Sequence, residues 1–497
     1  MAASTRMVGG ISGIDVTGPI SVSDDSATGC EVAGISRDRS GADGGSLDHI
    51  GALTPLARGA RQNHVLRHWL KVAVLLAAPL LLFLAAADAV ARGGQQWFSA
   101  WTVSHGARLT TPVLTGSSVR MIVRPTISGN AVRVKLENTL GQSPAVFSAA
   151  YIGQLQAGAA VVPGSNTQLT FTGSPGLSLA PGAGAWSDPV NFHVRAFERY
   201  VISLDVSSAS DISAHTLGLV TNYMAAGAHA ADPSADGFVP VPNLDPVVPV
   251  SNPAFPFYWV AAVDVKAPST TGTIVTFGDS ITDGRCSTRT NNGAASGVVL
   301  PDLYNRWADL LAKRLADLPA NQSKAVANEG IAGNRIVSGG AGPTALVRMD
   351  RDVLEREGAT HVIFFEGTND ITGGATAATV IAGSQQIIDR AHAAGLAIVG
   401  VTVIPRGSAT GWTNFMEQQR LAVNDWARNV ANFDGIIDFA ALMGGPIVTA
   451  NNSEEIRPDF SCFDGVHPNP AGYEAMGNFI ELSLFKNIGS WNNGPGH

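Results

Sequence analysis

Residue types suited to nucleophilic catalysis occur at both ends of the C-terminal half of the chain. Gly278-Asp279-Ser280 directly follows an apolar segment, and a serine at such a strand-to-helix turn can present its hydroxyl while the turn's backbone N–H groups bind an oxyanion. Asp464 and His467 lie near the C-terminus, and a turn through Gly465 can bring the carboxylate to the imidazole. An imidazole acts as a general base when an acceptor fixes its tautomer. These residues therefore predict a nucleophile, its base and the group that orients the base.

Two further polar turns follow apolar segments between these ends, at 328–334 and 366–370. The side-chain amide of Asn369, in the second turn, could donate a hydrogen bond to the same oxyanion. Each signal also has an ordinary structural explanation, since Ser280 could cap a helix and His467 could be a surface histidine beside one. Four such signals at the ends of four predicted strands favour a common site.

The elements around these residues alternate between strands and helices. Near-continuous apolar strands alternating with amphipathic helices predict a parallel sheet covered on both faces, in a three-layer α/β domain. The predicted strands are 273–277, 325–328, 361–365, 396–404 and 436–439, and the predicted helices are 303–318, 344–357, 377–394, 415–432 and 471–486, the last with Asn469 as N-cap and Pro470 as its first residue. Ligands of such sheets bind at the carboxyl ends of the strands, where the polar turns lie.

The preceding part of the chain has the pattern of short strands. Residues 119–123 and 132–136 alternate apolar and polar positions on either side of a short turn, which predicts a β-hairpin. Further strands are predicted at 146–152, 168–172, 190–194, 200–206 and 217–223. Many short strands with no helix between them predict a β-sandwich of jelly-roll type.

The division of the chain follows from these patterns. Proline density between 237 and 256 leaves no room for a central strand or helix and predicts a stiff connector. The predicted parts are a disordered N-terminal extension or one that precedes the true start of translation (1–64), a signal peptide (65–91), a β-sandwich domain (92–236), a Pro-rich connector (237–265), the α/β domain (266–488) and a tail (489–497). Trp97, Phe98 and Trp101 are predicted to be buried in the sandwich core; the alternative is that the sandwich packs against the α/β domain and walls its cleft.

The segment ahead of the sandwich has the features of a secretory signal. Basic residues lead into an apolar run, Val72–Ala87, and then into Ala89-Val90-Ala91, which predicts cleavage after Ala91 and a secreted protein, extracellular or periplasmic. The alternative is an uncleaved membrane anchor, but the run spans about 24 Å as a helix against the roughly 30 Å of a bilayer core. We therefore expect no stable membrane span after signal cleavage.

The composition excludes several classes of protein. Charged residues make up 14% of the chain, the net charge is −8 and no long basic block is present, so nucleic acid is not an expected partner. Three cysteines cannot form a disulfide scaffold, and no pair of them has the CxxC spacing of a zinc or redox site. The histidines are scattered, without HxH or HExxH, so we expect no metal and no cofactor.

Together, four short blocks resemble those of the SGNH (GDSL-type) hydrolases, in order: Gly278-Asp279-Ser280-Ile281, Gly333, Gly367-Thr368-Asn369-Asp370 and Asp464-x-x-His467. The resemblance extends from 273 to 486 and implies a flavodoxin-like, three-layer parallel-sheet domain. It implies that Ser280 is the nucleophile, that His467 is the general base and acid, and that Asp464 orients it. It also implies an oxyanion hole formed by the backbone N–H groups of Ser280 and Gly333 and the side-chain amide of Asn369. The strand-rich region resembles that of a subgroup of secreted bacterial members, a weaker match without a chemical motif.

The resemblance implies a serine esterase, or acylhydrolase, that forms an acyl-enzyme on a small-molecule or polysaccharide acyl ester. No long apolar lid is evident, which favours short acyl chains or O-acetylated carbohydrate as the substrate. A lipase or lysophospholipase acting on lipid esters is one alternative. A glycan-binding protein with a dead hydrolase domain is another, and the intact set of catalytic residues argues against it.

Cys286 and Cys462 are predicted to form a disulfide in the mature chain. Signal cleavage removes Cys30 and leaves these two cysteines in an oxidising compartment. They lie in the loops that carry Ser280 and His467, which catalysis requires to be adjacent. The cysteines could then reach the 4.4–6.8 Å Cα separation that a disulfide needs. The alternative is a pair of buried free thiols.

Overall fold

The computed structural model describes residues 94–242, 255–268, 271–319 and 322–486. All of them belong to one compact unit, residues 78–497. The predicted extension, signal peptide and tail, and Cys30, lie outside the described residues. Among the residues described, no helix is both long and apolar enough to cross a membrane.

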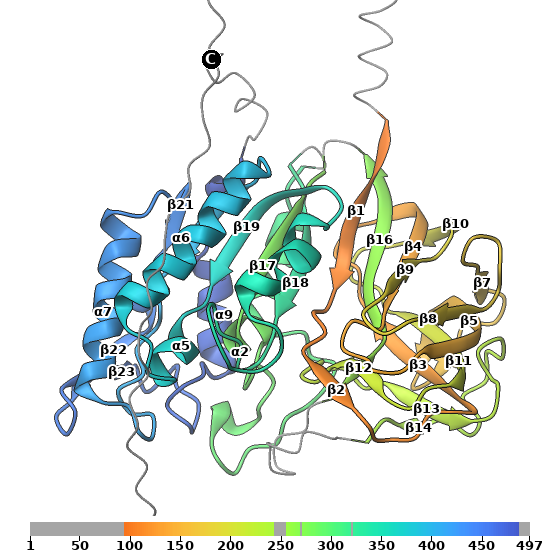
Figure 1. Cartoon of the computed structure of the whole chain (residues 1–497), viewed down its shortest axis with the longest axis horizontal. Coiled ribbons are helices and arrows are strands. Elements are labelled where there is room, and N and C mark those ends of the chain that lie inside the picture. Colours follow the sequence, from red (N-terminus) through yellow and green to blue (C-terminus); the bar gives the residue numbers. More distant parts are fainter. Residues whose placement is uncertain (1–93, 243–254, 269–270, 320–321, 487–497) are drawn as a thin grey trace, which may run out of the picture. The chain divides into compact units, whose positions relative to one another are not determined.

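The C-terminal half contains the predicted parallel sheet (Figure 1). Its strands are β17 (Thr273–Gly278), β18 (Ala325–Gly330), β19 (Ala359–Phe365), β20 (Ala397–Val401) and β21 (Gly435–Ile437), in the order β18-β17-β19-β20-β21. Every neighbouring pair is parallel. Gly278 at the end of β17 pairs with Gly330 on one side and Phe365 on the other. The loops that follow these three strands therefore begin side by side.

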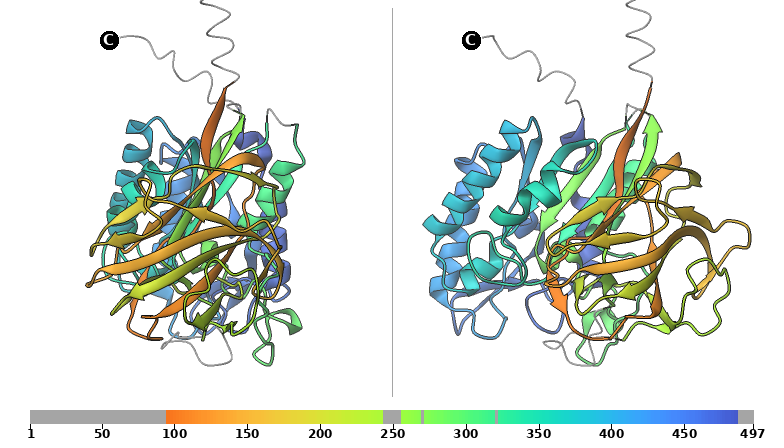
Figure 2. Two further views of the ribbon diagram at one scale, coloured as in Figure 1. Left: turned by 90° about the vertical axis from the view of Figure 1, so that its right-hand side faces the viewer. Right: turned by 45° about the vertical axis from the view of Figure 1, so that its right-hand side comes forward.

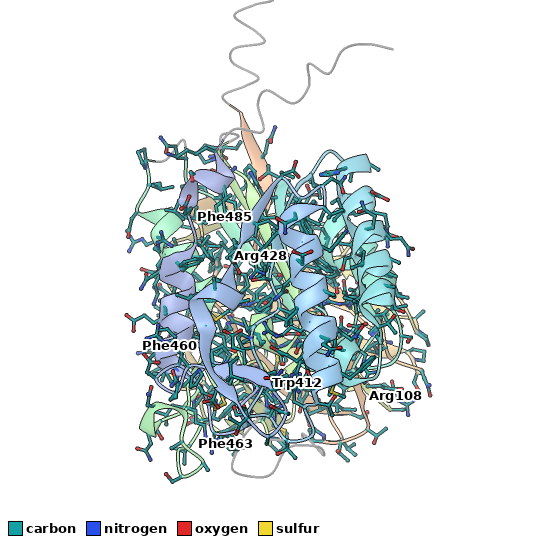
Figure 3. All side chains as sticks on the ribbon, turned by 90° about the vertical axis from the view of Figure 1, so that its left-hand side faces the viewer. Arg108, Trp412, Arg428, Phe460, Phe463 and Phe485 are labelled. Carbon is teal, nitrogen blue, oxygen red and sulfur yellow. A yellow bond between two sulfur atoms is a disulfide. The ribbon has the colours of Figure 1, made fainter. Side chains whose placement is uncertain are left out.

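Helices cover both faces of this sheet, as predicted. Successive residues of β17 point to opposite faces, so that Ile274 belongs to one apolar core and Val275 to the other. The first core is closed by α3 (Trp307–Ala316), α8 (Phe439–Met443) and α9 (Pro470–Phe479), and the second by α4 (Ala345–Met349), α6 (Ala377–Ala393) and α7 (Asn414–Asn429). Trp412 packs in the second core, and Phe485 packs in the first (Figure 3).

Local sequence explains where several helices begin and end. The Asn469 side chain accepts from the Gly472 N–H and Pro470 is the first residue of α9, as predicted. The helix predicted over 344–357 is α-helical only to Met349 and continues as one wide π-helical segment, Asp350–Leu354. This segment places Asp352, fully buried, against the guanidinium groups of Arg348, Arg351 and Arg356. The remaining short elements are α2 (Ser280–Asp283), η1 (Asn291–Gly293), α5 (Thr368–Thr372), β22 (Gly444–Val448), β23 (Ser453–Ile456) and η3 (Leu482–Phe485).

The part of the chain ahead of β17 is rich in antiparallel strands, as predicted. One sheet has the order β1-β16-β4-β10 with β9 paired to β4, a second has β14-β13-β3-β11-β5-β6 with β7 and β8 paired to β5, and a third has β15-β12-β2. The bounds are β1 (Gln95–Thr102), β2 (Ala107–Leu109), β3 (Ser117–Val123), β4 (Gly129–Glu137), β5 (Ala145–Ala157), β6 (Ala160–Val161), β7 (Thr167–Leu169), β8 (Leu177–Leu179), β9 (Gly184–Trp186), β10 (Val190–Val194), β11 (Tyr200–Ser208), β12 (Ile212–His215), β13 (Tyr223–Ala226), β14 (Val239–Pro240), β15 (Phe257–Tyr258) and β16 (Val260–Pro268).

The predicted hairpin of 119–123 with 132–136 is wrong. Both segments are strands, but β3 pairs with β11 and β13, whereas β4 pairs with β16, β10 and β9. Their apolar side chains contribute to the same core from two different sheets. An alternating pattern indicates that a strand has one buried face, but it does not identify the strand's partner. The strand predicted at 217–223 is also displaced, because the structure has β12 before it and β13 beginning at Tyr223.

The last strand of this region also differs from the prediction. Residues 257–265, assigned to the Pro-rich connector, form β15 and most of β16, and β16 lies between β1 and β4. The prolines that excluded a strand all precede Phe257, so the apolar segment behind them is free to pair. Residues 243–254 of the predicted connector lie outside the described residues.

Strand β1 packs on the parallel sheet beside β18 (Figure 2). The Ser99 N–H donates to the Glu357 carbonyl and the Glu357 N–H donates to Ser99 Oγ, each at 3.0 Å. Phe98 is buried against Gly358, where any side chain would collide with the Phe98 ring. The strand-rich region is therefore joined to the α/β region by buried apolar and polar contacts.

Candidate active site

Ser280 lies at the carboxyl edge of the sheet, as the first residue of α2. The Asp279 side chain caps this helix by accepting from the Ile281 N–H at 2.9 Å. Gly284, with φ of +102°, ends the helix after one turn. The buried strand β17 and this short capped helix therefore fix the backbone on both sides of Ser280.

The structure brings Ser280, His467 and Asp464 together. Ser280 Oγ lies 2.9 Å from His467 Nε2, and His467 Nδ1 lies 2.7 Å from Asp464 Oδ2. The other oxygen of Asp464 accepts from the backbone N–H groups of Val466 and His467, each at 3.0 Å. Gly465 has φ of +67° and no room for a Cβ, so this turn requires glycine. The three side chains thus form one hydrogen-bonded chain, with the hydroxyl at its end.

The electrostatic surroundings suit a neutral imidazole beside a carboxylate. Burial lowers the pKa of His467 below its usual value, the nearby Arg285 and Arg406 lower it further, and Asp464 partly opposes them. Burial alone would raise the pKa of Asp464, but the His467 ring and the two N–H donors hold it below its usual range. At neutral pH His467 can therefore accept a proton while Asp464 stays ionised.

Gly333 and Asn369 line the same cavity as Ser280 and His467. This cavity has a volume of about 480 Å³. Gly333 follows β18 with φ of +79°, a backbone conformation that favours glycine. Asn369, on α5 behind β19, donates through Nδ2 to the Asn334 carbonyl at 3.0 Å, which holds its side chain in place. The three residues predicted to form the oxyanion hole therefore line one cavity together with His467.

A comparison with protein families bears directly on this arrangement. Residues 276–475 match the model of the GDSL-like lipase/acylhydrolase family. This part of the chain belongs to that family. The matched segment runs from the strand before Ser280 into the helix after His467, so it contains every candidate residue named above.

Solved structures similar to the chain include other GDSL-family proteins. A lipolytic protein of the G-D-S-L family from Desulfitobacterium hafniense is 19% identical, with a TM-score of 0.31 over 43% of this chain and 98% of that one. A family two carbohydrate esterase from Clostridium thermocellum is 14% identical, with a TM-score of 0.29 over 75% of this chain and 92% of that one. A variant of an acetyl-xylooligosaccharide esterase from Geobacillus is 19% identical, with a TM-score of 0.30 over 42% and 95%. No curated protein matches the chain.

Several residues that line the cavity of this GDSL-like domain were not singled out from the sequence. Gly106, Arg108, His215 and Thr216 come from the strand-rich region, Asp283 ends α2, and Arg285 and Arg406 come from loops at the carboxyl edge of the parallel sheet. The strand-rich region therefore forms part of the cleft wall. This was the alternative role considered for it in the sequence analysis. Asp283 and Arg285 lie close to Ser280 in sequence and could have been found by their position. His215 is the last residue of the short strand β12, and no sequence pattern around it indicates its place in the fold.

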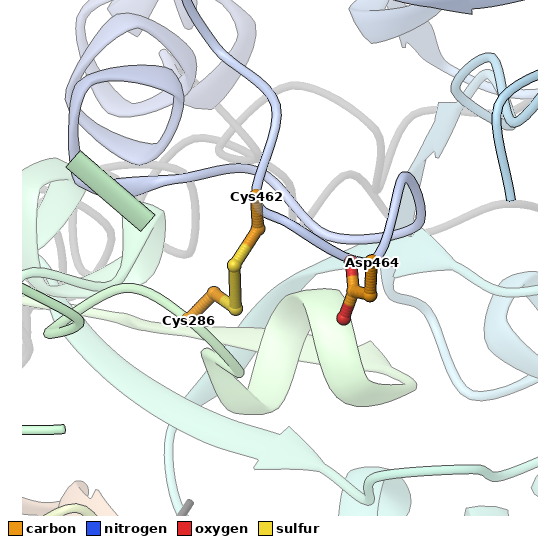
Figure 4. Close-up of side chains that lie close together, drawn as sticks. All are labelled: Cys286, Cys462 and Asp464. Atoms are coloured by element: carbon orange, nitrogen blue, oxygen red, sulfur yellow. A yellow bond between two sulfur atoms is a disulfide. The ribbon is translucent and has the colours of Figure 1, made fainter. Parts of the chain in front are cut away.

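Cys286 and Cys462 form the predicted disulfide, with a Cα separation of 6.5 Å (Figure 4). Their sulfur atoms and a carboxylate oxygen of Asp464 lie within 4.8 Å of one another. Two sulfurs bonded to each other are not thiolate ligands, so this cluster does not offer a metal site. The disulfide instead joins the loop after Ser280 to the loop that carries Asp464 and His467.

Replacement of Asn369 by alanine tests the oxyanion assignment. We expect kcat to fall about 10²–10³-fold, because one of three donors to the developing negative charge is lost. The measurement is steady-state hydrolysis of 4-nitrophenyl acetate, with Asn429→Ala, an exposed asparagine on α7, as the matched control. A kcat for Asn369→Ala equal to that of the control would exclude the amide from the oxyanion hole.

Proposed function

We propose that this protein is a secreted serine esterase that cleaves short-chain acyl esters or O-acetylated carbohydrate through an acyl-enzyme. The observation that carries the proposal is the chain Ser280 Oγ–His467 Nε2 and His467 Nδ1–Asp464 Oδ2, at 2.9 and 2.7 Å, beside a cavity in a GDSL-like domain. Membership of this family supports a carboxylic ester hydrolase.

In the acylation step, Ser280 Oγ attacks the ester carbonyl carbon while His467 Nε2 takes the hydroxyl proton. The negative charge on the carbonyl oxygen is stabilised by the N–H groups of Ser280 and Gly333 and by the Asn369 amide. Collapse of this intermediate breaks the bond to the alcohol, which leaves with the proton from His467. Asp464 holds the ring in the required tautomer and stabilises its protonated form.

In the second step His467 accepts a proton from water, whose oxygen attacks the acyl-enzyme. The tetrahedral intermediate collapses to release the acid, and Ser280 regains its proton from His467. The same donors serve both steps, because the negative oxygen forms at the same position.

The size of the cavity supports a small substrate, and its wall combines apolar side chains such as Leu109 and Ile331 with polar groups. A volume of about 480 Å³ accommodates a short acyl group and part of a sugar ring, and guanidinium, imidazole and backbone groups line it. The Cys286–Cys462 disulfide supports secretion, since disulfides persist mainly in oxidising compartments. Sequencing the N-terminus of the secreted protein tests the signal: a mature chain beginning well before residue 85 would contradict it.

The experiment that tests the function is an activity profile of the purified mature protein. It uses 4-nitrophenyl esters from acetyl to palmitoyl, and release of acetate from acetylated xylan and pectin. We expect the highest kcat/KM for the shortest acyl groups and no loss of activity in a chelator. Preference for palmitoyl esters would replace the short-chain assignment by a lipase, and binding to the glycans without hydrolysis of any ester would refute the enzyme.

A further inference from the structure

The cavity beside Ser280 carries an excess of positive charge, although the net charge of the whole chain is −8. Arg108, Arg285 and Arg406 line it, and Asp283 is the one carboxylate among its described lining residues. Asp283 Oδ1 lies 3.0 Å from His215 Nε2, so this carboxylate is already paired. The wall therefore presents three guanidinium groups, and its one lining carboxylate is already paired with His215.

Arg285 and Arg406 act on the candidate general base. Burial lowers the pKa of His467, and the positive charges of these two arginines lower it further. Within the described ranges neither forms an ion pair, although the charges of Asp279 and Asp464 act on Arg406 from a longer distance and partly oppose the lowering of its pKa by burial. Arg406 Nη1 donates to the Thr368 hydroxyl at 2.9 Å, while its Nε is buried without a hydrogen-bond partner. Arg108 (Figure 3) is more exposed than the other two arginines, and it lies 3.8 Å from Asp211.

We propose that the substrate is an anionic ester, whose carboxylate or other acidic group is bound by Arg285 and Arg406. The inference rests on the proposed esterase function and names its substrate class. A guanidinium group matches a carboxylate in geometry, and hydrogen bonds between charged partners are about twice as strong as neutral ones. Because both arginines line the same cavity as Ser280 and His467, the acidic group lies near the scissile bond, on either the acyl or the alcohol part.

Two matched pairs of substrates test the proposal and distinguish the two positions. For the alcohol part, acetate release from the acetylated methyl glycoside of glucuronic acid is compared with release from that of glucose. For the acyl part, 4-nitrophenyl hydrogen adipate is compared with 4-nitrophenyl hexanoate. We expect kcat/KM to be roughly tenfold or more higher for the anionic member of one pair, and to fall between about 0.02 and 0.5 M salt.

Variants locate the effect in the cavity. Arg285→Gln should reduce the ratio of anionic to neutral kcat/KM toward one, while Arg195→Gln, an exposed arginine paired with Glu198 outside this cavity, should leave the ratio intact. Equal rates for both members of both pairs would overturn the anionic substrate and leave the esterase standing. Failure to hydrolyse any ester would instead overturn the proposed function.

A second observation, independent of the arginines, concerns His215 at the end of β12. His215 Nδ1 lies 2.8 Å from the Ser104 carbonyl and Nε2 lies 3.0 Å from Asp283 Oδ1. Both ring nitrogens therefore lie within 3.0 Å of an oxygen; Nε2 makes no aligned hydrogen bond, so its contact with Asp283 is an ion pair when the ring is protonated. Asp283 Oδ2 in turn accepts from the Ala332 N–H at 2.9 Å, directly before Gly333.

The geometry points to His215 as a positioning residue for the oxyanion hole, acting through Asp283 on the loop that carries the Gly333 N–H. The titratable groups around this pair are His105, whose pKa the His215 charge helps to lower, and Arg306 and Tyr473, which Asp283 affects. Burial opposes the charge on His215, but Asp283 and the Ser104 carbonyl raise its pKa above the usual value. The strand-rich region thereby contributes to the reaction through a side chain.

The test is His215→Gln, which removes the charge and keeps a polar side chain. We expect kcat to fall roughly ten- to a hundredfold with little change in KM, because a small misplacement of a catalytic group has effects of this size. In the parent protein, activity should fall at low pH as His467 is protonated and at high pH as His215 loses its proton. His215→Gln should lack the high-pH decline.

His361→Gln is the matched control, a buried histidine in β19 toward the opposite end of the sheet. This control shows the effect of a loss of stability without a change at the site. Such a loss would lower the amount of active protein but would not change the shape of the pH profile. An unaltered kcat and an unaltered high-pH decline in His215→Gln would overturn the positioning role. Asp283→Asn should reproduce the profile of His215→Gln if the carboxylate links the two.

Discussion

Replacement of Ser280 by alanine is expected to lower kcat for ester hydrolysis by about 10⁴–10⁶-fold, the range seen when a nucleophile of this kind is removed. The substitution removes the atom that forms the acyl-enzyme, so the remaining oxyanion donors and binding contacts supply only residual acceleration. Little structural change is expected, because the Ser280 hydroxyl makes one hydrogen bond, to His467 Nε2. The measurement is kcat on 4-nitrophenyl acetate at saturating substrate.

A covalent probe tests the assignment of Ser280 as the nucleophile without a measurement of turnover. A fluorophosphonate should label the parent protein on the peptide that contains Ser280 and should fail to label Ser280→Ala. Ser483→Ala, an exposed serine distant in sequence, serves as the control for handling and folding. More than a tenth of the parent activity in Ser280→Ala, or labelling at another serine, would show that the nucleophile has been assigned wrongly.

The candidate site was largely predictable because its position follows from one rule of parallel sheets. Loops at the carboxyl ends of neighbouring strands share an edge, so Ser280, Gly333 and Asn369 are brought together once their strands are recognised. Asp464 and His467 were predictable for a local reason, since a glycine turn joins residues three positions apart. Long apolar strands and amphipathic helices identify such a sheet without reference to distant residues.

The strand-rich region was less predictable, because its pairings join residues far apart in sequence. The alternation of β3 and β4 correctly indicated strands but suggested pairing between neighbours, whereas β3 pairs with β11 and β4 with β16. His215 enters the cavity for the same kind of reason: the place of β12 depends on its pairing with β2 and β15. Local pattern does not encode such partners.

Removal of the disulfide, by Cys286→Ser together with Cys462→Ser, should lower both stability and activity. The bond closes a loop with a sequence separation of 176 residues, for which the loss of chain entropy in the unfolded state gives at most about 5 kcal/mol. Differential scanning calorimetry, with and without reductant, measures the change in Tm. Reductant should lower the Tm of the parent protein and leave that of the double variant unchanged.

Activity should fall along with stability because the disulfide is attached to the loop that carries Asp464 and His467. The Cys462 N–H donates to the His467 carbonyl at 2.9 Å, and the sulfurs lie within 4.8 Å of an Asp464 carboxylate oxygen. Without the bond, the loop that carries both residues is tied to the Ser280 loop only by weaker contacts, so the distance between His467 and Ser280 is less tightly fixed. Well below the Tm, where both proteins are folded, we therefore expect a lower kcat for the double variant. Thiol titration of the unfolded, unreduced mature protein tests whether Cys286 and Cys462 are bonded. Two free thiols per chain would mean that no disulfide forms, and the expected losses of stability and activity would then not apply.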